Sequence, residues 1–159
     1  MAKGTEIIVT ANPRGVKAEG FVSGTPKPGT CMQVKAATEP VGGRHTWEVF
    51  NADADGNRRI IAILLPKRLE GGLETAAYVD GDRCYLYFPL PGDMLNMLVA
   101  NISGTSDTFG IGDLLMVDDG TGKLIASTGS PESEPFVMME TVSTALTADT
   151  LEWVMFTGY

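Results

Sequence analysis

Turn-forming residues recur so closely along this chain that they limit its apolar segments to the length of a β-strand. The 159 residues include 19 glycines and 9 prolines, and Asp-Gly and Pro-Gly steps separate several of the apolar runs. Segments of about four to eight residues between such turns are typical of strands rather than of helices. We therefore expect an all-β fold, a small β-barrel or β-sandwich, with short helical turns such as one after Ser143.

The C-terminal segment 151–156 alternates in a way that predicts a strand. Its odd-numbered residues, which include Trp153, share one face, and its even-numbered residues share the other. We expect the face that carries Trp153 to lie in the core. No internal repeat is apparent anywhere in the sequence.

The stretch "DDGTGK" at residues 118–123 contains the end of a phosphate-binding consensus. A Walker A loop has the form G-x-x-x-x-G-K-[ST]. Val117 stands where the first glycine is needed, and Leu124 stands where the hydroxyl is needed. We therefore expect a β-hairpin between the apolar segments 113–117 and 123–127, with Lys123 facing solvent.

The stretch "NADADGN" at residues 51–57 resembles the start of a calcium-binding loop. The twelfth position of such a loop needs a bidentate glutamate, and here it is Ala62. The eighth position, which is normally apolar, is Arg58. A turn capped by Asp and Asn side chains is the better interpretation, and we expect no metal site.

Catalytic residues do not come together in the sequence. His45 is the sole histidine, and beside Trp47 it reads as a strand residue rather than a metal ligand. Ser106 and Asp107 have no nearby base to activate a nucleophile. The carboxylate pairs at 80/82 and 118/119 lie at tight turns, where aspartate stabilises the local backbone. We expect a protein that is not an enzyme and has no cofactor.

The charge is distributed unevenly along the chain. Residues 1–75 carry a net charge of +2, and residues 76–159 carry −10. An acidic half argues against nucleic-acid binding, which needs a clustered basic face. It suits a solvated surface or a partner that offers basic groups.

The two cysteines and the N-terminal residues indicate in which cellular compartment the protein is made. Cys31 and Cys84 are too few for a disulfide framework, and we expect two reduced, buried thiols, although a single bridge stays open. The N-terminal residues lack the apolar core of a signal peptide, and no apolar run approaches the ~20 residues of a membrane helix. We expect synthesis in a cytoplasm and no membrane partner.

Residues 1–20 are expected to form an extended N-terminal arm, and residues 21–159 the β-rich domain. The arm begins with the β-prone run "TEIIVT" and continues with few apolar residues. Such a run can add a strand to the sheet edge of a neighbour. The candidate docking residues are Ile7, Ile8, Val9, Arg14 and Lys17. The alternative is that "TEIIVT" completes the barrel of this protein.

Three blocks of the sequence resemble the head decoration, or capsid cement, proteins of tailed bacteriophages. They are "SGTPKPGTCMQV", "AYVDGDRCYLYFPLPGDMLNMLV" and the stretch from Gly112 to Tyr159. The shared pattern is a G-D-R strand, a P-G-D step, a G-D-x-L hairpin with an acidic Gly-rich tip, and an ending of the form E-T-V…D-T-L…T-G-Y. The pattern covers most of residues 22–159, with a fold expected to be of the β-tulip or SH3-like type.

This resemblance implies a structural virion protein without catalytic residues. It implies a protein made in the host cytoplasm that binds the outer capsid surface, bridges subunits of the major capsid protein and stabilises the head against the pressure of packaged DNA. It also implies a homo-oligomer, with a trimer favoured over a dimer. Joining several copies multiplies weak contacts with the shell.

Two other interpretations stay open. One is a carbohydrate-binding or adhesion β-domain, in which exposed aromatic residues such as Tyr85, Tyr87 and Tyr159 would form a platform. The other is a glycosidase-like enzyme that uses the turn carboxylates. The methionines of the C-terminal half fill the core or form a contact surface.

Overall fold

The computed structural model of this chain has an all-β fold, as the turn spacing predicts. It describes residues 7–10, 15–36, 38–51, 61–67, 76–100, 108–127, 135–142 and 148–158, and no helix occurs among them. The helical turn expected after Ser143 falls at residues 143–147, outside the described residues. The strands are β1 Ile8–Thr10, β2 Val16–Val22, β3 Cys31–Val34, β4 Thr46–Val49, β5 Ala62–Leu64, β6 Arg83–Phe88, β7 Met94–Val99, β8 Leu114–Val117, β9 Leu124–Ala126, β10 Phe136–Met138 and β11 Thr150–Phe156.

Five strands from the first half of the chain close into a barrel, here called barrel A. They lie in the order β2-β4-β3-β5-β6, and β2 pairs with both β4 and β6. Burial of apolar side chains in the barrel drives its closure. The buried cluster consists of Val22, Met32, Trp47, Ala62, Leu64, Tyr78, Cys84 and Leu86.

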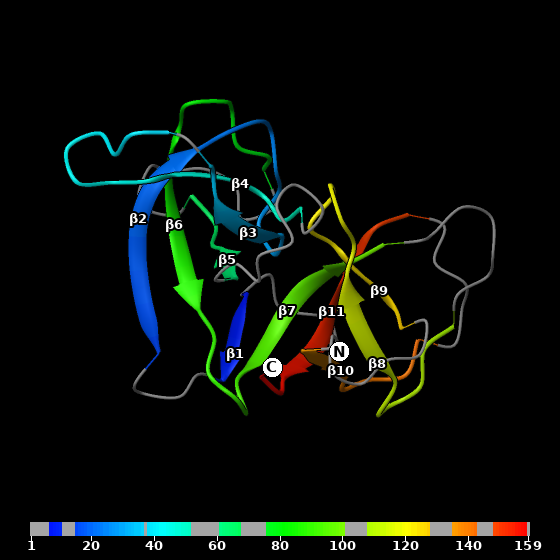
Figure 1. The fold of residues 1–159 in the computed structure, drawn as a ribbon. Helices are drawn as coiled ribbons and strands as arrows, with labels where there is room; N and C mark the ends of the chain where they lie inside the picture. The colour runs from blue at the N-terminus through cyan, green and yellow to red at the C-terminus, as the bar shows by residue number, and fades with distance from the viewer. Residues whose placement is uncertain are drawn as a thin grey trace.

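The later strands form a second ring, here called barrel B. Their sheet has the order β1-β7-β11-β10-β8-β9, and β9 returns to pair with β7 at Val99 and Leu124. Strand β1 lies outside this ring and pairs with the start of β7. Figure 1 shows the two barrels side by side, with β1 between them.

The two barrels are two copies of one topology. Taken in chain order, β2 to β6 correspond to β7 to β11, and each of the five strand pairings in barrel A has a counterpart of the same orientation in barrel B. Even the single parallel contact is repeated, because β2 pairs with β4 as β7 pairs with β9. The structure therefore contains an internal repeat that is not apparent in the sequence.

Individual hydrogen bonds confirm this correspondence residue by residue. Ser23 N–H donates to Trp47 C=O at 2.7 Å, and Ala100 N–H donates to Leu124 C=O at 2.8 Å. The strand registers continue the same match through the other pairings. The equivalent positions include Phe21 and Leu98, Pro28 and Ile111, Gly29 and Gly112, Thr30 and Asp113, Cys31 and Leu114, Ile63 and Val137, and Tyr87 and Met155.

Compensating changes in side-chain size hide the repeat in the sequence. In barrel A a Cβ added at Gly20 would lie 2.5 Å from Cδ1 of Trp47, so the large ring fills the space above the glycine. The equivalent pair in barrel B is Met97 and Leu124, both buried. Protein interiors are close-packed, so each pair fills the interior space of its own barrel. The two pairs nevertheless have no residue type in common.

Three turns explain the Gly-Asp motifs of the sequence. In each of them the aspartate amide donates to the carbonyl three residues earlier, and its carboxylate accepts from the amide of that same residue. The glycine before the aspartate has a φ of 83° to 95°, as in type II turns. The turns end at Asp82, Asp93 and Asp113. Lys27 to Thr30 form a related turn, with threonine in place of aspartate.

Barrel A docks onto barrel B through the short segment 28–31. Leu98 N–H donates to Gly29 C=O at 3.1 Å, and Cys31 N–H donates to Gly122 C=O at 2.7 Å. The segment therefore lies between β7 and β9 of barrel B. In barrel A the corresponding gap is closed, because Phe21 N–H donates directly to His45 C=O at 3.0 Å.

Two expectations from the sequence need correction here. Strand β11 alternates as predicted, but the even-numbered face with Val154 and Phe156 is the buried one, and Trp153 is 36% exposed. The expected boundary at residue 20 falls inside β2, a strand of barrel A. Residues 16–20 thus lie in a strand of barrel A, and β1 pairs with β7 of barrel B, so these residues pack with the barrels.

Candidate docking surfaces

The predicted docking residues do not gather on one exposed surface. Ile7 is 2% exposed and lies in the core of barrel B, so it is not available to a partner. Ile8 and Val9 lie in β1, whose backbone pairs with β7. Lys17 is exposed on β2, and Arg14 lies outside the described residues. Of the predicted set, only Lys17 is described as exposed.

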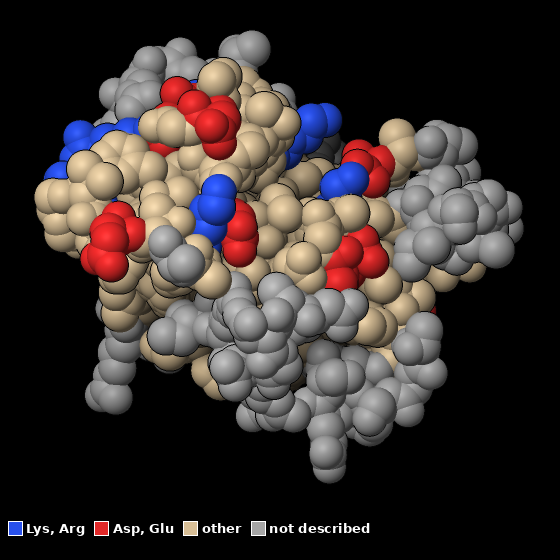
Figure 2. Space-filling model, turned by 45° about the horizontal axis from the view of Figure 1, so that its top comes forward, with Lys and Arg blue, Asp and Glu red and all other residues tan. Residues whose placement is uncertain are grey.

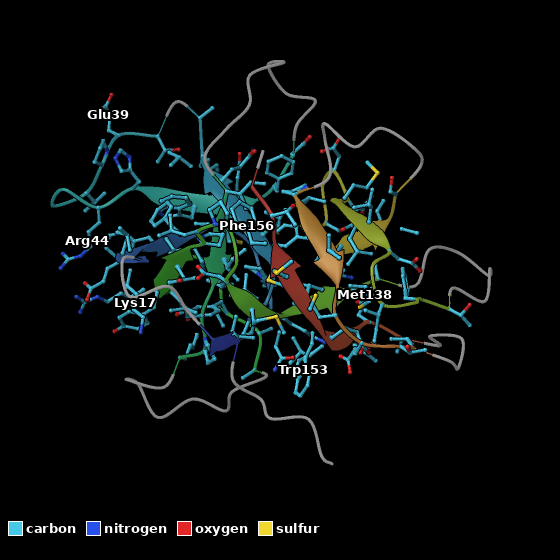
Figure 3. The ribbon with its side chains drawn as sticks, turned by 90° about the horizontal axis from the view of Figure 1, so that it is seen from below. Lys17, Glu39, Arg44, Met138, Trp153 and Phe156 are labelled. Atoms are coloured by element: carbon cyan, nitrogen blue, oxygen red, sulfur yellow. The ribbon has the colours of Figure 1, made fainter. Side chains whose placement is uncertain are left out.

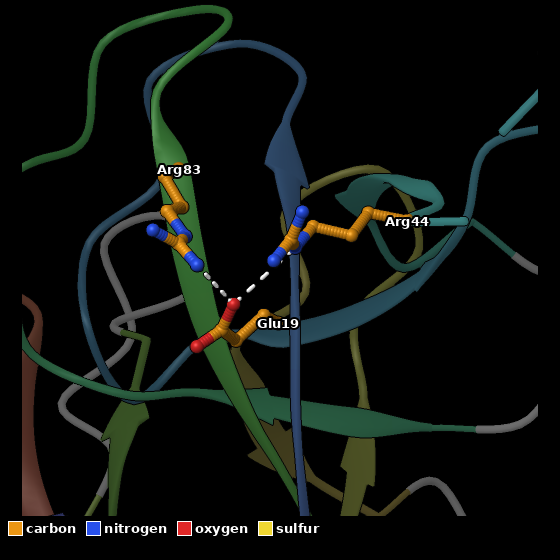
Figure 4. A network of polar contacts seen from close by, with 3 residues as sticks. All are labelled: Glu19, Arg44 and Arg83. Carbon is orange, nitrogen blue, oxygen red and sulfur yellow. Dashed lines mark hydrogen bonds and ion pairs between the residues drawn. The ribbon is translucent and has the colours of Figure 1, made fainter. Parts of the chain in front are cut away.

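A network of ion pairs covers the outer end of barrel A near Lys17. The carboxylate of Glu19 lies between the guanidinium groups of Arg83 and Arg44, at 3.3 Å from the latter (Figure 4). The hydrogen bond from Arg83, and then the charges of both arginines, lower the pKa of Glu19. All three side chains are about two-fifths exposed, so the pairing orients them with little effect on stability.

Charges of both signs are interspersed on the face of the molecule shown in Figure 2, with uncharged areas between them.

The hairpin predicted between the segments 113–117 and 123–127 is confirmed, since β8 and β9 pair antiparallel. Lys123 is half-buried and pairs with Asp149 at 2.5 Å rather than pointing freely into solvent. The turn itself contacts barrel A through Gly120 N–H and Gly122 C=O, so it is part of the interface between the barrels.

Barrel B presents an exposed apolar surface around residues 111–114, here called the 111–114 surface. Ile111 is 68% exposed and Leu114 is 39% exposed. Leu114 lies opposite Val137 in the register, and Val137 lies opposite Met155, so a row of apolar side chains crosses three strands. Val137 and Met155 are half-buried. Trp153 lies on the same face of β11 as Met155 and projects away from the barrel (Figure 3).

The equivalent surface of barrel A is fully covered. Cys31 and Ile63 have no exposed area and Tyr87 is 1% exposed, although all three point out of barrel A. They belong to the apolar cluster of barrel B, which lies over them. The same position in the fold is thus a buried interface on one barrel and an open surface on the other.

Residues that could carry chemistry remain dispersed. Among the described residues, no group of three or more His, Cys, Asp or Glu side chains is placed to hold a metal ion. His45 is exposed on barrel A. Asp82, from one predicted carboxylate pair, accepts from Val79 N–H and from Lys67, and the bond with Lys67 is the main reason its pKa is lowered. Both predicted carboxylate pairs, 80/82 and 118/119, lie at turns.

A shallow cleft of about 480 Å³ lies where the two barrels meet. Its walls include Lys27 and Pro28 from barrel A and Leu98, Asp149 and Leu151 from barrel B. Two further lining residues interact with each other, because the hydroxyl of Thr150 donates to the carboxylate of Glu152 at 2.6 Å. Of the three tyrosines expected to form an aromatic platform for carbohydrate binding, Tyr87 is buried between the barrels, Tyr85 is half-buried, and Tyr159 lies outside the described residues.

Both cysteines are free thiols and both are buried. Burial raises the pKa of Cys84 to about 12 and also raises that of Cys31. In the part of the chain that is described, no helix is long and apolar enough to cross a membrane.

Sequence reasoning overlooked the 111–114 surface. The signal was the β-branched Ile111 in the turn "GIGD", a position where a polar residue or proline is more usual. The equivalent position in barrel A is Pro28, which is buried. Exposed apolar side chains that lie close together, such as Ile111 and Leu114, are typical of contact surfaces.

Comparison with known proteins gives few matches. No family model matches the chain, and no curated protein matches it. Among solved structures, the head fiber gp8.5 N base of bacteriophage phi29 is similar, with a TM-score of 0.49 at 11% sequence identity, covering 90% of this chain and 94% of that one.

Proposed function

We propose that this chain is a structural protein of a tailed-phage virion that binds the outer surface of the capsid. In this role it bridges subunits of the major capsid protein and stabilises the head against the pressure of packaged DNA. It is made in the host cytoplasm and acts as a homo-oligomer, a trimer before a dimer. It contacts neither nucleic acid nor membrane and catalyses no reaction.

One observation carries this proposal. The sequence motifs that resemble capsid decoration proteins coincide with the Gly-Asp turns that shape this all-β fold, at Asp82, Asp93 and Asp113. Each motif that carries the resemblance therefore has a defined structural role in this fold. The open apolar 111–114 surface adds support, because a protein that binds a shell needs an exposed contact surface.

The test is reconstitution on capsids. Heads of the parent phage assembled without this protein are mixed with the purified chain, sedimented, and imaged by electron cryo-microscopy. We expect saturable binding at positions that follow the lattice of the outer shell, and greater resistance of decorated heads to heat or chelator. Failure of the protein to sediment with the heads would refute the proposed function.

A further inference from the structure

Barrel A shows how this fold docks onto another β-structure. The four residues 28–31 are buried, and their backbone supplies Gly29 C=O to Leu98 N–H and Cys31 N–H to Gly122 C=O. Next to them Phe50 C=O accepts from Gly120 N–H at 2.9 Å. The segment thus acts as a short added strand, held by main-chain hydrogen bonds and covered by apolar side chains.

The same segment occurs on barrel B with its surface open. Residues 111–114 occupy the positions of residues 28–31, and all four are exposed. The turn is held in the same conformation, because Gly112 N–H donates to Met138 C=O at 2.9 Å as Gly29 N–H donates to Leu64 C=O at 2.9 Å. The apolar residues Leu114, Val137 and Met155 replace Cys31, Ile63 and Tyr87.

The charges on and near the 111–114 surface limit which kind of partner can bind it. The carboxylate of Asp113 is already bound by Gly110 N–H within the turn. The neighbouring row of Leu114, Val137 and Met155 carries no charge. A partner must therefore offer apolar side chains. If it binds as barrel B binds residues 28–31, it also offers free backbone groups at a strand edge.

Neither barrel of a second copy offers an open gap of this kind between its described strands. The gap between β7 and β9 is occupied by the copy's own residues 28–31. The corresponding gap in barrel A is closed by the hydrogen bond from Phe21 N–H to His45 C=O. A second copy therefore cannot receive residues 111–114 in the way that barrel B receives residues 28–31.

We propose that residues 111–114 dock as an added strand segment into an open strand edge of a different, β-containing protein, with Ile111, Leu114, Val137 and Met155 forming the apolar contact. Under the proposed function, on which this identification of the partner rests, that protein is the major capsid protein. The contact would repeat between proteins the interface that joins the two barrels within this chain.

The experiment compares the wild-type chain with the double variant Ile111→Asp/Leu114→Asp on undecorated heads. Val41→Asp is the matched control, because Val41 is 63% exposed at a turn of barrel A. We expect the double variant to bind heads at least about tenfold more weakly, since it would bury unpaired charge, while the control binds like wild type. The melting temperature and oligomeric state of both variants should match the wild type.

A hydrogen-exchange measurement on wild-type protein makes the result independent of variant folding. We expect the amides of residues 112–115 to gain protection when heads are added. Unchanged binding of a folded double variant, or protection confined to other segments, would overturn the docking proposal while leaving the proposed function intact. A change of oligomeric state in the double variant would show that a second copy occupies the surface, and would also overturn it. If wild-type protein does not bind heads at all, the proposed function fails and the assignment of the partner fails with it.

Discussion

The hydroxyl of Tyr87, at the end of barrel A, donates a hydrogen bond of 2.5 Å to the buried carboxylate of Asp93, at the start of barrel B. The same carboxylate oxygen accepts from Leu90 N–H at 2.7 Å, so one side chain fixes the turn between the barrels and the face on which they meet. The link is short and buried, and it gives the P-G-D step of the sequence a physical role.

Removing this hydrogen bond should destabilise the protein. We expect Tyr87→Phe to lower the free energy of unfolding by about 1.5–3 kcal/mol, the usual range for a hydrogen bond to a charged group. Chemical denaturation followed by tryptophan fluorescence measures the change. Tyr85→Phe is the control on the same strand, and an equal loss in both variants would contradict the assigned role of Asp93.

Stability should also decline at alkaline pH because of Tyr87. Its burial, and then its interaction with Asp93, raise the pKa of the hydroxyl above the ordinary value of 10.0. Folding therefore favours the protonated phenol, and this contribution is complete below pH 10 and is lost as pH rises further. Melting temperatures measured from pH 8 to pH 11 should fall less steeply for Tyr87→Phe than for wild type.

The two equivalent glycines should respond differently to alanine. Gly29 and Gly112 have φ of 84° and 95°, so either substitution strains the backbone by about 1 kcal/mol. A Cβ at Gly29 would also lie 2.9 Å from Leu151 Cδ2 and 3.2 Å from Asn96 O, whereas nothing lies within 4 Å at Gly112. Gly29→Ala should therefore melt clearly below Gly112→Ala. Equal melting temperatures would show that residues 28–31 do not pack between β7 and β9.

Alanine substitutions at Trp153 and Phe156 should show which face of β11 is buried. Trp153 is 36% exposed, whereas Phe156 is 6% exposed. The ring of Phe156 packs on the ring of Phe136, with the two centroids 5.3 Å apart. We expect Phe156→Ala to cost about 3–5 kcal/mol and Trp153→Ala about 1 kcal/mol or less. The reverse order in urea denaturation would mean that the register of β11 is shifted by one residue.

The N-terminal segment should contribute to folding rather than behave as a loose arm. Ile7 is buried in barrel B, and its carbonyl accepts from Asn96 N–H at 2.7 Å. We expect Ile7→Ala to destabilise by about 2–5 kcal/mol, and deletion of residues 2–18 to prevent folding because it removes β1 and part of β2. Circular dichroism decides the point, and a truncated protein with an unchanged melting temperature would restore the arm hypothesis.

Local features of the fold were predictable from the sequence. Turn positions follow from glycine and aspartate, since Gly81, Gly92 and Gly112 adopt a φ that other residues rarely take. Alternation likewise predicted the strand at residues 151–156, and the Gly-rich turn between the apolar segments 113–117 and 123–127 predicted the hairpin. These features depend on the backbone and its immediate neighbours, so the sequence by itself determined them.

Only the tertiary structure decided which faces are covered. Alternation separates Trp153 from Val154, but it does not say which of them points inward, because either face is apolar enough to be buried. The repeat of barrel A in barrel B was invisible because Gly20 with Trp47 fills the same space as Met97 with Leu124. Whether Cys31 and Leu114 are buried depends on what lies over each barrel: barrel B covers the first, and no part of the described chain covers the second. The burial of such side chains depends on how the strands and the two barrels pack together, and the order of residues does not specify it.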